Sequence, residues 1–293
     1  RAGKSASAIS DCHEIILVDD GSPDSSLAVA KAEAHDNPRL KIIELSKNYG
    51  HHRAMLTGLA HSSGDYVFLT DIDLEEQPEN LLRFWEEFQA DEELDVVYGE
   101  QGARETPWPK KVSSQVFYRL FNAMSDIQIS DRELVSRLMN RRFVDSLLGY
   151  EEESLFLPAI WTAAGFKQKA VLAEKSFDGI SSYSFRKRLT LAIDAVTSFS
   201  AQPLVFVFYA GMILSMMSGS AIVYFVVKKL ILGTPLLGWT SLIASIFLMG
   251  GLILSCLGVI GIYISKIFLE VKSRPSSIVR AIHQSEGFNE VKN

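Results

Sequence analysis

The pattern of apolar and polar positions divides the chain into two parts. Up to residue 202, short apolar runs alternate with charged stretches, as in a soluble domain. Beyond it, residues 203–227 and 236–265 carry no charged side chain at all. Both runs exceed the roughly 20 apolar residues that cross a bilayer. The pattern therefore predicts a transmembrane hairpin over residues 203–268, with spans at about 203–227 and 237–265.

Within the soluble part, four short apolar runs alternate with helical patterns. The predicted strands are residues 14–20, 40–45, 65–71 and 94–100. The predicted helices are residues 25–36, 51–63 and 78–90. Strands that alternate with helices are typical of a mostly parallel sheet covered by helices on both faces. We therefore expect an α/β fold for residues 1–183.

The segments that flank the hairpin indicate its orientation. Residues 184–202 begin basic and continue with apolar residues at helical spacing, which fits an amphipathic helix on the membrane surface or a linker helix packed on the domain. Lys and Arg are frequent before the first span and after the second, although Lys228 and Lys229 lie between the spans. Because cytoplasmic flanks carry more Lys and Arg, we expect both termini, including a tail at 269–293, in the cytoplasm. Small residues in both spans would let helices pack closely, so a homo-oligomer is compatible with the sequence.

The overall charge argues against a nucleic-acid-binding protein, and the cysteine content argues against a disulfide-stabilised or zinc-binding one. The net charge is -6, which argues against a nucleic-acid partner, because phosphate backbones attract an excess of Lys and Arg. The two cysteines, Cys12 and Cys256, are far apart and form neither a disulfide framework nor a zinc-binding spacing. The soluble part therefore suits a reducing, cytoplasmic environment.

Acidic residues follow two of the predicted strands, Asp19–Asp20 and Asp71–Asp73. Ligands of open α/β sheets bind beyond the carboxyl ends of the strands. If the extended geometry continues, Asp71 and Asp73 present their carboxylates on one face, where they suit Mg²⁺ or Mn²⁺. Glu75 and Glu76 fit either further site groups or solvated charges at a helix entry.

Three motifs together resemble the family 2 glycosyltransferases of GT-A fold. They are EIILVDDGSPDSS at 14–26, NYGHHRAMLTGLAHSSGDYVFLTDIDLEEQPENL at 48–81 and DVVYGE at 95–100. With the hairpin, the chain is similar to the membrane-bound polyprenyl-phosphate branch, which includes dolichol-phosphate mannose synthases and undecaprenyl-phosphate glycosyltransferases. The resemblance implies a GT-A catalytic domain at 1–183. It also implies an inverting enzyme that uses Mg²⁺ or Mn²⁺ and moves a sugar from a nucleotide sugar to polyprenyl phosphate at the inner membrane face.

The resemblance further implies a donor site at the strand ends. Asp71 and Asp73 match the D-x-D pair that holds the metal on the diphosphate of the donor. Glu75 stands where many relatives have Gln, and we expect this third catalytic candidate to bear on the choice of sugar. The nucleotide-binding candidates are Asp19, Asp20, Ser22, Asn48 and Gly50.

An acceptor site is implied by basic residues in the middle of the chain. Relatives often carry an arginine where this chain has Gln101, and we expect Arg104 to compensate. Lys110, Lys111 and Ser114 match the cluster that meets the lipid phosphate.

Several alternatives stay open on the sequence. Family members open with an apolar strand ending in Pro-Tyr-Asn-Glu, which is absent before Glu14, so we expect the sequence to be a fragment. Other functions are transfer to another lipid-linked or polysaccharide acceptor, and an inactive membrane scaffold. A processive polysaccharide synthase would carry a Q-x-x-R-W motif, which the chain lacks. His51 and His52 are expected at a helix start, and residues 137–142 fit either a phosphate contact or a solvated basic face.

Overall fold

A computed structural model describes residues 1–102, 130, 132–150, 152, 156–173, 197, 200, 202–232, 238–285 and 288 of the chain. The chain forms two compact units. Unit 1 comprises Arg1–Asn122, Ile127–Phe185 and Ser273–Asn293, and unit 2 comprises Ala123–Asp126 and Arg186–Lys272.

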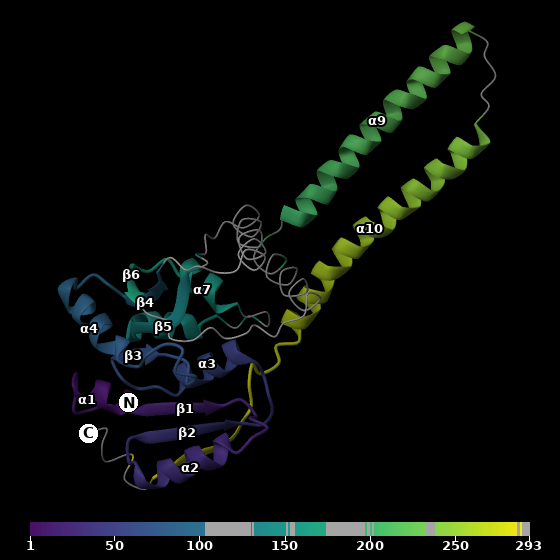
Figure 1. Ribbon diagram of the computed structural model, residues 1–293. Helices are drawn as coiled ribbons and strands as arrows, with labels where there is room; N and C mark the ends of the chain where they lie inside the picture. Colours follow the sequence, from purple (N-terminus) through teal and green to yellow (C-terminus); the bar gives the residue numbers. More distant parts are fainter. Residues whose placement is uncertain are drawn as a thin grey trace. The chain divides into compact units, whose positions relative to one another are not determined.

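The first sheet of unit 1 has the strand order β1-β2-β7. Its strands are β1 (Ile15–Asp19), β2 (Leu40–Leu45) and β7 (Val279–Gln284). β1 and β2 are parallel and are connected by α2 (Ser26–Asp36), as the sequence pattern predicts (Figure 1). Every residue of β2 is buried, and Ala34 of α2 packs in one apolar cluster with Leu40 and Ile42.

The second sheet of unit 1 has the strand order β3-β5-β4-β6. Its strands are β3 (Tyr66–Leu69), β4 (Val96–Gln101), β5 (Glu133–Asn140) and β6 (Gln168–Ala173). The helix α4 (Asn80–Ala90) covers it, and Phe84 and Phe88 of this helix share a buried cluster with Val97 and Leu138. Burying an aromatic side chain in this way is among the largest single contributions to a core.

The sheets are mixed, in contrast to the mostly parallel sheet expected from the sequence. The pairs β1–β2 and β4–β6 are parallel, whereas β2–β7, β3–β5 and β4–β5 are antiparallel. The antiparallel pairs all involve β5 or β7, two strands that the apolar pattern did not predict. β7 also shows that residues 279–284, expected within a tail, form part of a sheet.

The helix α3 (His51–Ala60) lies between β1 and β3 (Figure 1) and contacts both β1 and α6 (Arg141–Leu148). The turn after α3 adds a polar link, since the guanidinium of Arg141 donates to the carbonyl oxygen of Gly64 at 2.6 Å. Among the described residues, unit 1 also contains α1 (Ala2–Ser7) and α7 (Leu157–Ala163). α3 thus packs against β1 of the first sheet and against α6, the helix that follows β5 of the second sheet.

One buried carboxylate fixes the turn after β3 to the second sheet. Glu76 is 3% exposed, and its two oxygens accept the backbone N–H groups of Val135 at 3.1 Å and Ser136 at 2.6 Å. Glu76 is therefore a buried residue bound to the backbone, and the expectation that it is a solvated charge is wrong.

A second carboxylate ties β7 to the first sheet. Glu44, on β2, accepts hydrogen bonds from Lys31 at 2.8 Å and Arg280 at 3.2 Å, and its Oε2 lies 2.9 Å from Nε2 of His283. Hydrogen bonds from Lys31 and then His283 lower the pKa of Glu44 to about 2. Two of these three partners, Arg280 and His283, belong to β7.

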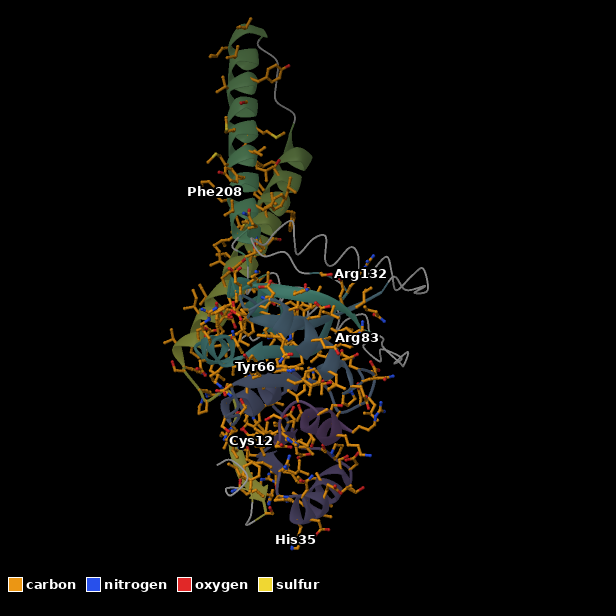
Figure 2. All side chains as sticks on the ribbon, turned by 90° about the vertical axis from the view of Figure 1, so that its left-hand side faces the viewer. Cys12, His35, Tyr66, Arg83, Arg132 and Phe208 are labelled. Carbon is orange, nitrogen blue, oxygen red and sulfur yellow. The ribbon has the colours of Figure 1, made fainter. Side chains whose placement is uncertain are left out.

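Unit 2 contains two long helices, α9 (Gln202–Leu232) and α10 (Trp239–Val271). Ser245–Val271 is long and apolar enough to cross a membrane, and no residue of it is buried. Gln202–Ser218 forms a shorter apolar stretch. Apolar side chains project from α9, among them Phe208, which is labelled in Figure 2. Exposed apolar surface of this extent marks a membrane or protein contact.

The buried Glu76 generates a stability prediction. Glu76→Ala leaves two backbone N–H groups without their acceptor, at a cost of about 1–3 kcal/mol each, so we expect the free energy of unfolding to fall by about 2–6 kcal/mol. Chemical unfolding in detergent, followed by tryptophan fluorescence, measures this change. Glu79→Ala is the matched control, because this exposed residue pairs with Arg1 and is expected to cost under about 1 kcal/mol. Equal losses in both variants would contradict the structural role of Glu76.

Glu44 generates a pH prediction. A carboxyl whose pKa is lowered on folding stabilises the fold above its ordinary pKa of about 4.5, and this contribution is lost as the pH falls from there towards 2. We expect Glu44→Gln to speed the opening of β7 about fivefold at pH 7, a modest factor because Lys31 and Arg280 are partly exposed. Amide hydrogen exchange of β7 in both proteins measures the ratio. A ratio that stayed constant from pH 7 to pH 2.5 would refute this role.

Candidate active site

The ends of β1 and β2 meet through the carboxylate of Asp20. Its Oδ1 accepts the backbone N–H of Tyr49 at 2.6 Å, and its Oδ2 accepts that of Gly50 at 2.8 Å. Gly21 permits the close approach, because its φ is 72° and a Cβ there would lie 2.8 Å from the backbone nitrogen of Asn48. The predicted nucleotide-binding residues Asp20, Asn48 and Gly50 are thus brought together.

Asp19 shapes the turn on which Ser22 lies. Its carboxylate accepts the backbone N–H of Gly21 at 3.2 Å and that of Ser22 at 3.4 Å. Such bonds between an aspartate and the backbone two or three residues later stabilise tight turns. Asp19 and Asp20 therefore act on the backbone around the site, and their contact with a nucleotide stays a prediction.

Asp71 and Asp73 lie beyond β3, which ends at Leu69. The strand geometry that was expected to align them does not continue, because Ile72 and Asp73 form a turn and Leu74 has a φ of 59°. Oδ1 of Asp73 accepts the backbone N–H of Glu75 at 2.9 Å, which closes this turn. A left-handed leucine is a strained conformation of the kind that collects at functional sites.

The two groups of acids meet at the first residue of α3. His51 follows Gly50 directly, and its Nε2 lies 3.5 Å from Oδ1 of Asp71. The expected helix-start position of His51 is confirmed, but sequence reasoning missed its proximity to Asp71. The sequence feature that could have indicated this proximity is the position of His51 immediately after the loop Asn48-Tyr49-Gly50.

The residues of this turn suit a metal that is shared with a ligand. In the part of the chain that the structure describes, no three His, Cys, Asp or Glu side chains gather closely enough to hold a metal by themselves. Asp71 and Asp73 offer hard carboxylate oxygens, and Mg²⁺ is commonly held by one or two carboxylates together with the phosphates of a substrate. The pair therefore fits a metal bound on a diphosphate.

Arg137 has neither of the roles expected for residues 137–142, a phosphate contact or a solvated basic face. This side chain is fully buried on β5, where burial lowers its pKa to about 10. It donates to Oε1 of Glu133 at 3.0 Å and to the carbonyl oxygen of Leu134 at 3.1 Å, and it lies over the ring of Trp161. Arg137 is therefore a residue of the protein core on β5.

The predicted acceptor residues lie outside the described residues. They are Arg104, Lys110, Lys111 and Ser114. Gln101, expected to have replaced an acceptor arginine, is the last residue of β4.

Comparisons with known proteins identify the family of the chain. The family model of glycosyl transferase family 2 matches residues 6–148, which contain the loop at Asn48 and the turn at Asp71. A Mycobacterium tuberculosis protein described as "Putative glycosyltransferases" is 40% identical over 286 residues, which are 98% of this chain and 83% of that protein. The uncharacterized glycosyltransferase YkcC of Bacillus subtilis is 36% identical over 92% of this chain and 83% of its own length.

A third relative is named by its acceptor. The SfII prophage-derived bactoprenol glucosyl transferase of Shigella flexneri is 32% identical over 274 residues, 92% of this chain and 88% of that protein. These similarities extend over nearly the whole sequence, including the helices of unit 2. The chain belongs to glycosyl transferase family 2.

Proposed function

We propose that the protein transfers a sugar from a nucleotide-sugar donor to polyprenyl phosphate at the cytoplasmic face of a bacterial inner membrane. The observation that carries the proposal is the meeting of the Asp20 loop and the Asp71 turn at the start of α3. A nucleotide sugar needs both a nucleotide pocket and a diphosphate site next to it. The name of the bactoprenol glucosyl transferase supports the acceptor.

In this proposal the donor binds across the two turns. Asp20 holds the loop of Asn48 and Gly50 in place, and this loop with Ser22 forms the nucleotide pocket. Asp71 and Asp73, with Glu75 next in the turn, would hold Mg²⁺ or Mn²⁺ together with the diphosphate. When bound, the metal offsets the negative charge that grows on the departing diphosphate.

The acceptor phosphate is the nucleophile. One of its oxygens attacks the anomeric carbon while the bond from that carbon to the diphosphate breaks, and the electron pair leaves with the nucleoside diphosphate. A single displacement of this kind inverts the anomeric centre. Because the acceptor is already an anion, it requires cations that position it rather than a base. We assign this task to Arg104, Lys110 and Lys111, with Ser114 donating a hydrogen bond.

The pairing of β7 supports a membrane hairpin with two spans. β7 follows α10 in sequence and β2 precedes α9, yet both strands lie in one sheet. Two strands of one sheet lie on the same side of a membrane, so if α10 crosses it, a second crossing is needed, and α9 is our candidate for it. The excess of Lys and Arg next to the hairpin supports a cytoplasmic position for that side. We keep the amphipathic helix at 184–202 as part of this proposal.

Asp73→Asn tests the donor site. Replacing a metal-binding carboxylate with an amide weakens the hold on the diphosphate, and we expect the rate of transfer to fall at least about 100-fold, in line with the loss of one strong electrostatic contact. Membranes that contain the full chain are incubated with radiolabelled sugar nucleotides, Mg²⁺ or Mn²⁺ and undecaprenyl phosphate, and the labelled lipid is measured.

Asp91→Asn is the matched control. Asp91 follows α4 and pairs with Lys167, away from the acidic turn, so this variant should retain the wild-type rate. Membrane insertion should be equal in all three proteins. Wild-type activity in the Asp73 variant would rule out its assigned role.

A further inference from the structure

The chain that follows α10 forms a short strap, residues 277–280, which binds the backbone just beyond β2. The backbone N–H of Ser46 donates to the carbonyl oxygen of Ile278 at 2.9 Å. The guanidinium of Arg280 donates to the carbonyl oxygen of Ser46 at 2.6 Å. Both backbone polar groups of Ser46, the first residue after β2, are therefore bound by the strap.

The strap also contacts α3, which begins after the loop at 47–50. Oγ of Ser277 lies 2.6 Å from Oγ1 of Thr57, a buried residue of α3. Thr57 donates its single hydroxyl hydrogen to the carbonyl oxygen of Arg53 at 2.7 Å, so Ser277 is the donor of this pair. The loop at 47–50 thus lies between two parts of the chain that the strap binds.

Asp20 provides a second anchor, at the other end of this loop. Its carboxylate accepts the backbone N–H groups of Tyr49 and Gly50. A side-chain contact connects the two anchors, since Oγ of Ser46 lies 2.9 Å from the hydroxyl oxygen of Tyr49. Asn48, between the anchors, is exposed. A loop that is ordered in advance binds its ligand at a lower entropic cost.

Arg280 contributes to the position of the loop more than to the core. Its side chain is 60% exposed, and its contact with Glu44 at 3.2 Å is one of three. Lys31 and His283 remain next to Glu44 when the guanidinium is removed. The main consequence of its removal is therefore the release of the carbonyl group of Ser46.

From these contacts we propose that Arg280 is a positioning residue for the donor, because it keeps the loop at 47–50 in the conformation that binds the nucleotide. It acts through Ser46 and the loop rather than on the donor itself. The apparent affinity of a ligand falls in proportion to the fraction of protein that is competent to bind it. The strap thereby sets the affinity for the donor, whereas Asp71 and Asp73 act on the bound donor. This inference rests on the proposed function.

Arg280→Ala tests the positioning role. We expect the Kd of the nucleoside diphosphate and the KM of the donor to rise about fivefold, at the lower end of couplings between separate sites. The kcat at saturating donor should not change, because the bound loop is ordered. Calorimetry of the full chain in detergent with Mn²⁺ and UDP or GDP measures the Kd, and sugar transfer from UDP-glucose or GDP-mannose measures KM and kcat.

Two further variants of the strap keep the test independent of folding. Arg280→Lys retains a charged donor for the carbonyl oxygen of Ser46 and should recover most of the affinity. Ser277→Ala removes only one hydroxyl, and it should raise the Kd less than Arg280→Ala does, because a neutral hydrogen bond is weaker than a charged one. Amide exchange at Tyr49 and Gly50 should be faster in Arg280→Ala than in the wild-type protein.

Arg142→Ala is the matched control. Arg142 is also an exposed arginine paired with a buried carboxylate, that of Asp95, which directly precedes β4 in the second sheet. Its replacement should leave the Kd, the KM and the exchange of the loop unchanged.

An unchanged Kd in Arg280→Ala, or an equal rise in Arg142→Ala, would overturn the positioning role and leave the proposed function intact. A higher Kd without faster exchange of the loop would also overturn it, because the arginine would then contact the nucleotide directly. A lower kcat at unchanged KM would do the same. A wild-type protein that bound neither UDP nor GDP and transferred no sugar would instead refute the proposed function and this inference together.

Discussion

The buried carboxylate of Glu76 is the contact on which the site depends most. It lies three residues after Asp73 and accepts two backbone N–H groups of β5. The acidic turn is thereby fixed to the same strand that carries Glu133 and Arg137. An ionised carboxylate is costly to bury unless hydrogen bonds replace its hydration, and here both oxygens have backbone donors. One residue thus sets the position of the acidic turn, the proposed diphosphate site, relative to β5.

A second constraint comes from the end of the chain. β7 pairs with β2, and Arg280 of β7 donates to the carbonyl oxygen of Ser46 at 2.6 Å, just before the loop that Asp20 holds. The segment that follows α10 therefore braces the strand that leads into the nucleotide loop. In the proposed enzyme, the chain that leaves α10 thus continues into a strand that is hydrogen-bonded next to the proposed nucleotide loop.

The sequence predicted the elements that are apolar and local. β2 has the expected bounds, since all six of its positions are buried, and α2 and α3 follow from their spacing. β5 was missed because Glu133 and Arg137 look solvated in the sequence, although they neutralise each other in the core. β7 was missed because its partner strand is more than 200 residues away. The sequence did not predict that Glu76 is buried whereas Glu75 is not. The directions of these two side chains depend on the left-handed conformation of Leu74, which a hydrophobic pattern does not reveal.

In the candidate site, too, the sequence predicted the local features but not the tertiary contacts. The acids at the ends of β1 and β3 were found by their position after apolar strands, whereas the contact of His51 with Asp71 required the tertiary structure. The most direct test of the account is lipid-linked product formation by the wild-type chain in membranes supplied with Mn²⁺, undecaprenyl phosphate and a panel of labelled sugar nucleotides. The account predicts a labelled, mild-acid-labile lipid from at least one donor, lost when the metal is chelated. Absence of labelled lipid from every donor would contradict it.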